Sequence, residues 1–159
     1  MLTGVLLGHT DPPLSAEGRR EIANVDINAA VGYTSPLRRC AESASLVARR
    51  NTPVLVIQDL REISFGEWDG LAWQQIEQRW PAESAAKLRN WLGITPPGGE
   101  SRESFVERLD AVLLQVRSGP MPAAIVAHQA VNARLAYLLS GSEELTFQQA
   151  YGEVYEYTI

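Results

Sequence analysis

The chain has two histidines, and one of them, His128, stands where a strand is predicted to end. Residues 123–127 read Ala-Ala-Ile-Val-Ala, and a Gly-Pro-Met-Pro turn signal at 119–122 precedes them. A short apolar run of this kind predicts a buried parallel strand, and a helical pattern follows over 131–139. Because ligands of open α/β sheets bind at the carboxyl ends of strands, we expect His128 to lie where chemistry would be done. The alternative is a histidine that only caps the strand.

A pair of arginines follows a second predicted strand, residues 31–34. Pro36 suits the first position of a helix, so Arg38 and Arg39 are expected in the first turn of that helix. Basic side chains there oppose the helix dipole, which favours anions at this end. A bound phosphate would resolve the conflict, because free N–H groups and a guanidinium both suit it, whereas the alternative is a solvated arginine pair. The predicted core stripe of this helix is Leu37, Cys40, Ala44, Val47 and Ala48.

Two predicted loops contain further candidate functional residues. Residues 60–70, Leu-Arg-Glu-Ile-Ser-Phe-Gly-Glu-Trp-Asp-Gly, follow a predicted strand at 54–57. Loops supported by a rigid sheet are where function concentrates. Residues 96–101, Pro-Pro-Gly-Gly-Glu-Ser, form a turn that opens a helix. That helix is expected to bury Phe105, Leu109, Val112, Leu113 and Val116.

These segments resemble the histidine phosphatase superfamily, which includes cofactor-dependent phosphoglycerate mutases and many phosphomonoesterases. Residues 34–39, Thr-Ser-Pro-Leu-Arg-Arg, are similar to the family's Ser-Pro-Leu-x-Arg segment, and the resemblance makes Arg39 a phosphate ligand. The loop at 60–70 is similar to the family's Leu-x-Glu and Phe-Gly-x-Trp-x-Gly motifs, which implies that Glu62 is the general acid.

The later motifs follow in the family's order. Residues 97–101, Pro-Gly-Gly-Glu-Ser, are similar to a turn of the phosphatase branch. Residues 125–128, Ile-Val-Ala-His, resemble the strand that carries the second active-site histidine, here His128. Gln129 stands where relatives usually have glycine, so we expect it to narrow the substrate site while its backbone N–H stays available. The resemblance covers essentially the whole chain.

The N-terminal segment departs from the family pattern, because it has no Arg-His-Gly motif. In the family, the histidine of that motif is the nucleophile. One alignment places residues 5–10 on that motif and makes His9 the nucleophile. The preferred alignment matches residues 4–18 to the family's next segment, Gly-x-x-x-Gly-x-x-Asp-x-Pro-Leu-Ser/Thr-x-x-Gly. Gly8 then belongs to a substrate-contacting loop, and His9 is a variable neighbour. The first strand, with its Arg-His-Gly, would lie upstream of Met1.

The resemblance implies hydrolysis of a phosphomonoester, a small phosphorylated metabolite, through a phosphohistidine intermediate. Glu62 would donate a proton to the leaving alkoxide, while Arg39 and protonated His128 would neutralise the phosphoryl oxygens. The given chain is expected to lack its nucleophile. The alternatives are an active phosphatase or phosphoglycerate mutase-type enzyme that uses His9, and a non-catalytic pseudoenzyme that binds phosphorylated ligands. No cofactor is expected, and no metal, since the two histidines and Cys40 form no ligand pattern.

Composition places the chain among ordinary globular proteins. At 159 residues, 45% of them hydrophobic, one domain with a full core is expected. A net charge of −5 without a basic face argues against nucleic acid as a partner. No apolar run approaches the length of a membrane span, so the protein is expected in the cytoplasm without a membrane partner. Pairing into a homodimer is left open. The single cysteine, Cys40, is predicted to be buried in the core.

The predicted fold is α/β, a three-layer α/β/α sandwich with a mostly parallel central sheet, phosphoglycerate mutase-like in architecture. Residues 1–159 are expected to form a single histidine phosphatase-like domain with a helical, lid-like insert at about 71–95. Ser15 is the candidate N-cap of a short helix through Ala23, and residues 153–159 alternate like a closing edge strand. Three tryptophans of the insert are interpreted as packing residues, with a roof over the active site as the alternative: Trp73, Trp80 and Trp91.

Overall fold

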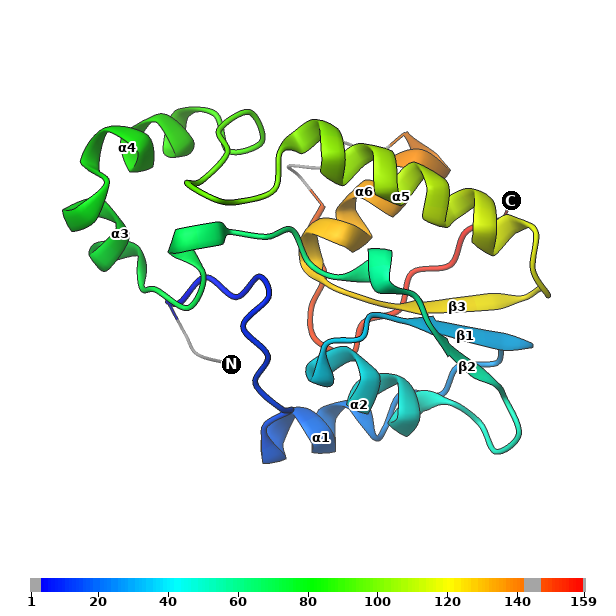
Figure 1. Ribbon diagram of the computed structural model, residues 1–159. Coiled ribbons are helices and arrows are strands. Elements are labelled where there is room, and N and C mark those ends of the chain that lie inside the picture. The colour runs from blue at the N-terminus through cyan, green and yellow to red at the C-terminus, as the bar shows by residue number, and fades with distance from the viewer. Residues whose placement is uncertain (1–3, 142–146, 159) are drawn as a thin grey trace. The chain divides into compact units, whose positions relative to one another are not determined.

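The computed structural model describes residues 4–141 and 147–158 (Figure 1). The chain divides into two compact units: the first unit comprises residues 1–10 and 63–107, and the second unit comprises residues 11–62 and 108–159. The elements along the chain are α1 (Ala16–Ile22), β1 (Val31–Thr34), α2 (Arg38–Val47), β2 (Val54–Val56), the 3-10 helices η1 (Gln58–Leu60) and η2 (Gly66–Trp68), α3 (Trp73–Arg79), α4 (Pro81–Arg89), α5 (Arg102–Arg117), β3 (Ala123–Val126) and α6 (Gln129–Ser140).

The second unit is built on a parallel sheet whose described strands run in the order β2-β1-β3. Tyr33 in the central strand lies opposite Leu55 of β2 and Ile125 of β3. In Figure 1, α1 and α2 lie on one face of this sheet, and α6 with the C-terminal part of α5 lies on the other. The predicted α/β architecture with a parallel sheet is confirmed. Because these strands run in the same direction, their carboxyl ends meet at one edge of the sheet.

The helices bury the stripes that their sequence periodicity predicts. In α2 and its N-cap, the buried members of the stripe are Leu37, Cys40, Ala44 and Val47, while Ala48 is half-buried. In α5 the whole predicted stripe is buried: Phe105, Leu109, Val112, Leu113 and Val116. Complete burial of one aliphatic or aromatic side chain contributes about 1.5–3 kcal/mol, so these stripes are the main attachment of the two helices.

The helix ends are set by identifiable caps. Ser15 is the N-cap of α1, as predicted, and its hydroxyl accepts a hydrogen bond from the Gly18 N–H at 3.0 Å. Gly141 ends α6 in the left-handed conformation that favours glycine. The prediction that Pro36 is the first residue of α2 is wrong, because the helix begins at Arg38 with Leu37 as its N-cap. The side chains of Ser35 and Asp11 accept the Leu37 and Arg38 N–H groups, so the regular helix starts after them.

Two strand predictions need correction. Residues 123–126 form a parallel strand, but all of them are half-buried rather than buried, because β3 pairs with β1 alone among the described strands. Residues 153–158 form no strand, and Ile159 lies outside the described residues. Instead the C-terminal segment folds on itself: the rings of Phe147 and Tyr155 lie 5.3 Å apart, and the Tyr155 hydroxyl donates to the Gln148 carbonyl. Its alternation therefore does not reflect pairing with the sheet.

The first unit has a tryptophan cluster at its centre. Trp68 is fully buried, and the rings of Trp73 and Trp80 lie 5.9 and 6.2 Å from it. Trp91 packs on Trp73 at 6.0 Å, and the Lys87 ammonium lies over the Trp91 ring. Pro81 is the first residue of α4 and so separates it from α3, because proline suits the first position of a helix. The packing interpretation of the three tryptophans of the insert is confirmed.

The N-terminal segment belongs to the first unit and not to the parallel sheet. Val5 forms an isolated antiparallel bridge with Ala72. The Leu6 N–H donates to the Leu71 carbonyl at 3.0 Å, and the Leu6 carbonyl accepts from the Gly70 N–H at 2.8 Å. Residues 5–7, the apolar run before Gly8, are thus hydrogen-bonded through their main chain to the loop that follows η2.

Candidate active site

The candidate site of the second unit begins where β1 and β3 end. Ser35 follows β1, is fully buried, and donates its N–H to the Val126 carbonyl at the end of β3. Its hydroxyl oxygen lies 2.8 Å from Nε2 of His128. Ser35 therefore joins the two strand ends through both its backbone and its side chain. Ser35 was not among the predicted site residues, although its place directly after a strand is the signal that could have identified it.

The His128 imidazole contacts Cys40 as well as Ser35. The Cys40 Sγ lies 3.5 Å from Nδ1 and 3.4 Å from Nε2 of the imidazole, and the thiol donates to the Ala127 carbonyl at 3.1 Å. Only 6% of the His128 surface is exposed. The imidazole is thus held in one orientation by a hydroxyl and a thiol before any ligand binds.

Glu62 is also buried, with 7% of its surface exposed. Its Oε2 accepts a hydrogen bond from the Ala130 N–H at 3.3 Å, in the first turn of α6 and two residues after His128. The N–H groups in the first turn of a helix have no partner within the helix, so this one is available to the Glu62 carboxyl group. Glu62 and His128 are therefore brought together through the start of one helix.

Arg108 of α5 supports the loop that carries Glu62. Its guanidinium donates to the carbonyls of Asp59, Arg61 and Glu62, the Arg61 bond being 2.9 Å long. Local sequence patterns did not identify this role, because the partners are 46–49 positions apart in the chain.

The charges of Arg39 and Glu62 both act on the Cys40 thiol. Burial raises the pKa of Cys40 to about 12, the positive charge of Arg39 opposes the rise, and the negative charges of Glu62 and Asp11 add to it. His128 contacts this thiol directly, and Arg39 precedes Cys40 in the first turn of α2. Glu62 reaches the same region through its bond to the start of the helix that follows His128.

Arg39, and not Arg38, stays the predicted phosphate ligand. Arg38 is exposed, its Nη2 lies 3.7 Å from Glu42, and the next residue points about 100° around the helix. We expect Arg39→Lys to weaken binding of inorganic phosphate or vanadate by roughly 1–3 kcal/mol with the fold intact. Arg38→Lys, the matched control, should have a much smaller effect in the same calorimetric titration. Equal losses for the two variants would show that the wrong arginine is assigned.

The buried thiol predicts a pH effect on stability. In the unfolded chain the Cys40 thiol ionises near its ordinary pKa of 9.0, whereas in the folded chain it stays protonated up to about 12. The unfolded state therefore binds fewer protons between these values, and the free energy of unfolding falls as pH rises from 9 towards 12. This loss is at most about 1.4 kcal/mol per pH unit and should be absent from Cys40→Ala. Urea unfolding of both proteins at pH 8 and pH 10.5 measures it, and parallel pH dependences would contradict the burial of the thiol.

The other predicted site residues make different contacts. The side chain of Gln129 is exposed and donates to the Phe147 carbonyl at 2.9 Å. Gly8 and His9 belong to the first unit, where Gly8 is buried and the His9 side chain is exposed. The N–H groups of both residues donate to the carboxylate of Asp69. His9 thus stands in a loop and not at the end of a strand of the parallel sheet.

The two loops that the sequence singled out meet within the first unit. The Glu67 N–H donates to the Pro97 carbonyl at 2.9 Å, and the Glu100 N–H donates to the Ser64 carbonyl at 3.0 Å. A Cβ on Gly66 would lie 2.2 Å from the Pro97 carbonyl oxygen, so only glycine fits this approach. The two motifs therefore form one tight loop pair.

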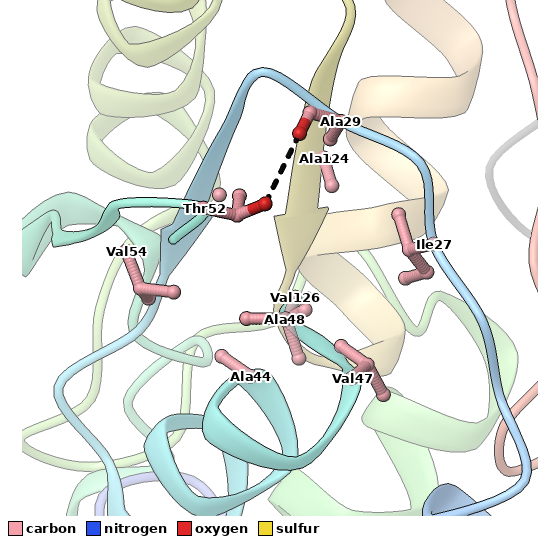
Figure 2. Close-up of a pocket in the computed structure, with 10 residues that line it drawn as sticks. Ile27, Ala29, Ala44, Val47, Ala48, Thr52, Val54, Ala124 and Val126 are labelled. Carbon is pink, nitrogen blue, oxygen red and sulfur yellow. Dashed lines mark hydrogen bonds between the residues drawn. The ribbon is translucent and has the colours of Figure 1, made fainter. Parts of the chain in front are cut away.

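A small apolar cavity of about 20 Å³ lies under the sheet, between its strands and α2 (Figure 2). It has room for about one water molecule and is lined by no titratable side chain, so it is not a metabolite site. Within residues 4–141 and 147–158, no three His, Cys, Asp or Glu side chains converge as a metal site. The helices in that part of the chain are all too short or too polar to cross a membrane.

Comparison with known proteins identifies the same family that the motifs resemble. The family model of the histidine phosphatase superfamily (branch 1) matches residues 2–159. The chain belongs to this superfamily. Among curated relatives, a bifunctional protein of Mycobacterium tuberculosis is 35% identical over 127 residues, which are 70% of this chain and 30% of that protein. The adenosylcobalamin/alpha-ribazole phosphatase of Escherichia coli is 26% identical over 88% of this chain and 73% of its own.

Solved structures of this superfamily share the fold. The alpha-ribazole phosphatase of Shigella flexneri superposes with a TM-score of 0.78 at 26% identity, over 90% of this chain and 75% of its own. A phosphoglycerate mutase of Thermus thermophilus gives 0.70 at 30% identity, over 89% and 77% of the two chains. A mycobacterial glucosyl-3-phosphoglycerate phosphatase gives 0.72 at 28% identity, over 89% and 74%. The phosphoglycerate mutase-like architecture is therefore confirmed, and the chain spans only about 30% of the first curated relatives it matches.

Proposed function

We propose that the protein hydrolyses a small phosphomonoester through a phosphohistidine intermediate. The observation that carries the proposal is the buried His128 imidazole, fixed by Ser35 and Cys40 where β1 and β3 end, with the buried Glu62 carboxyl bonded to the start of the helix that follows it. Arg39 lies in the first turn of α2, directly before Cys40. A cation can neutralise charge on the phosphoryl oxygens, a buried carboxyl group can exchange a proton with the leaving oxygen, and a fixed imidazole can hold the phosphoryl group. Membership of the histidine phosphatase superfamily supports the same chemistry.

Each group has a distinct task in this reaction. Arg39 binds the phosphoryl oxygens, and protonated His128 donates a further hydrogen bond to them as negative charge develops. A histidine nitrogen forms a bond to phosphorus while the P–O bond to the alcohol breaks. Glu62 gives its proton to the departing oxygen, because an alkoxide leaves poorly. The Glu62 carboxylate then takes a proton from water as that water attacks phosphorus, which releases phosphate and restores the histidine.

The nucleophilic histidine is proposed to come from a strand with an Arg-His-Gly motif upstream of Met1. Two observations support this placement. His9 is in a loop of the first unit. The segment before it pairs with Ala72 through Val5 and does not join the parallel sheet. Among the described strands, β3 pairs only with β1, and its residues are half-buried, so its outer edge can accept another strand. A strand added there would end beside His128.

The reaction is proposed to be hydrolysis, in which water takes the phosphoryl group. The alternative is a mutase reaction, which moves the phosphoryl group between two hydroxyl groups of one metabolite. Support comes from the Pro97–Ser101 turn, which resembles the phosphatase branch, and from relatives named as phosphatases of alpha-ribazole and glucosyl-3-phosphoglycerate. These names belong to the relatives, and for this chain only the class of small phosphorylated substrates is proposed.

The proposal is tested by measuring phosphate release from p-nitrophenyl phosphate, glycerol phosphate, 3-phosphoglycerate and a nucleoside 5′-monophosphate by the complete gene product. We expect release from at least one ester, and we expect His128→Ala to slow it by roughly 10²–10³-fold. Formation of 2-phosphoglycerate without phosphate release would identify a mutase. Protection against unfolding by phosphate esters without any turnover would identify a binding protein. Either result would overturn the proposal.

A further inference from the structure

The Ser35 hydroxyl has two hydrogen-bond partners in the part of the chain that the structure describes. The Leu37 N–H donates to its oxygen at 3.2 Å, and Nε2 of His128 lies 2.8 Å from the same oxygen. A serine hydroxyl offers one proton and two lone pairs, whereas a backbone N–H can only donate. The Leu37 N–H therefore occupies a lone pair, and Nε2 is the acceptor within reach of the hydroxyl proton.

The burial of this contact determines the direction of the bond. Ser35 is fully buried and His128 is buried as well, so bulk water does not take the hydroxyl proton. A buried donor without an acceptor costs free energy, and the hydroxyl is therefore expected to donate to Nε2. An imidazole nitrogen that accepts a hydrogen bond carries no proton, which leaves the proton of the neutral ring on Nδ1.

The Cys40 thiol does not compete with Ser35 for Nε2. Its proton is donated to the Ala127 carbonyl at 3.1 Å. The sulfur lies 3.5 Å from Nδ1 and 3.4 Å from Nε2, and an atom at nearly equal distances from both nitrogens lies along the N–H direction of neither. The thiol thus packs against the ring, and Ser35 is the contact that distinguishes one nitrogen from the other.

We infer that Ser35 is a positioning residue that fixes the proton of the neutral His128 imidazole on Nδ1. The inference rests on the structure for the tautomer and on the proposed function for its role in the reaction. In that reaction, Nδ1 is then the nitrogen that donates to a phosphoryl oxygen. When His128 is protonated, the Nε2–H can donate to the second lone pair of the Ser35 oxygen, so Nδ1 keeps its proton in both states.

Nitrogen-15 NMR of the His128 side chain tests the tautomer in the complete gene product. The spectrum is recorded without ligand at about pH 8.5, where an ordinary histidine is neutral, and the His128 signals are identified by their loss in His128→Gln. We expect the wild type to carry the proton on Nδ1. In Ser35→Ala the form protonated on Nε2 should become the major one, because free histidine prefers that form in water. Ser43→Ala, the matched control, removes another buried hydroxyl that is bonded within α2, and its spectrum should match the wild type.

The role in the reaction is measured by hydrolysis. Because His128 acts on the phosphoryl oxygens and not on the leaving oxygen, Ser35→Ala should lower kcat/KM for glycerol phosphate and p-nitrophenyl phosphate alike. The expected loss is about tenfold, as for one hydrogen bond, and the Ser43→Ala control should stay within about twofold of the wild type. A loss confined to glycerol phosphate would place the effect on proton donation to the leaving oxygen and would overturn the role assigned to Ser35.

The spectrum and the rates test the inference independently. A proton on Nε2 in the wild type, which needs no variant to observe, would overturn the assigned tautomer. A Ser35→Ala protein that keeps its proton on Nδ1 would show that Ser35 does not determine it. A wild-type protein that hydrolyses none of the esters refutes the proposed function and with it the role in the reaction, while the spectrum still decides the tautomer.

Discussion

Replacing Glu62 by glutamine is expected to slow the hydrolysis of alkyl phosphate esters by roughly 10²–10⁴-fold, because the amide cannot give a proton to the leaving oxygen. The substitution keeps the size of the side chain and its amide oxygen can still accept the Ala130 N–H at 3.3 Å, so the fold should be retained. Steady-state rates with glycerol phosphate, together with a thermal unfolding curve for each protein, measure both effects.

The leaving group distinguishes a general acid from a binding residue. Nitrophenolate leaves without protonation, so p-nitrophenyl phosphate should lose far less activity in Glu62→Gln than glycerol phosphate does. Asp59→Asn, an exposed acid of the same loop, serves as the matched control and should behave like the wild type. A uniform loss for both esters would make Glu62 a binding or structural residue.

The second large effect concerns the strand that is proposed to lie upstream of Met1. We expect residues 1–159 alone to be slower than the upstream-extended gene product by more than about 10³-fold, because this is the scale on which loss of a nucleophile acts. The extension should also raise the midpoint of urea unfolding, since backbone groups at the outer edge of β3 gain partners. Activity and stability are therefore expected to return together when the coding sequence before Met1 is included.

Two results would contradict this expectation. One is an upstream coding sequence without an Arg-His-Gly motif that follows an apolar run. The other is full activity of residues 1–159 that His9→Ala abolishes, which would make His9 the nucleophile of an enzyme without the usual neighbouring arginine.

Sequence patterns predicted the elements that are determined locally. The stripes of α2 and α5 follow helical periodicity, and Ser15 marks a helix start because its hydroxyl can accept a backbone N–H. The motifs likewise predicted that Arg39 and His128 each lie beyond the carboxyl end of a strand, whereas the structure shows that these strands are neighbours. Each of these inferences depends on residues that are close together in the chain.

Sequence patterns did not predict contacts between residues that are far apart in the chain. The Ser35 hydroxyl and the His128 imidazole are 93 positions apart, and Arg108 supports the Glu62 loop from a different helix. The half-buried state of β3 and the turn near Tyr155 were missed for a related reason. Apolar runs and alternation describe a single segment, whereas burial depends on whether a second segment pairs with it.

The most direct test is to locate the phosphoryl group on the enzyme. The upstream-extended protein is mixed with a turned-over phosphate ester, quenched in denaturant at alkaline pH, where phosphohistidine survives, and mapped by mass spectrometry. The proposed mechanism predicts a phosphohistidine in the upstream strand, its accumulation in Glu62→Gln with nitrophenyl phosphate, and none on residues 1–159. A phosphoryl group on His9 or His128, or on a hydroxyl side chain, would contradict it.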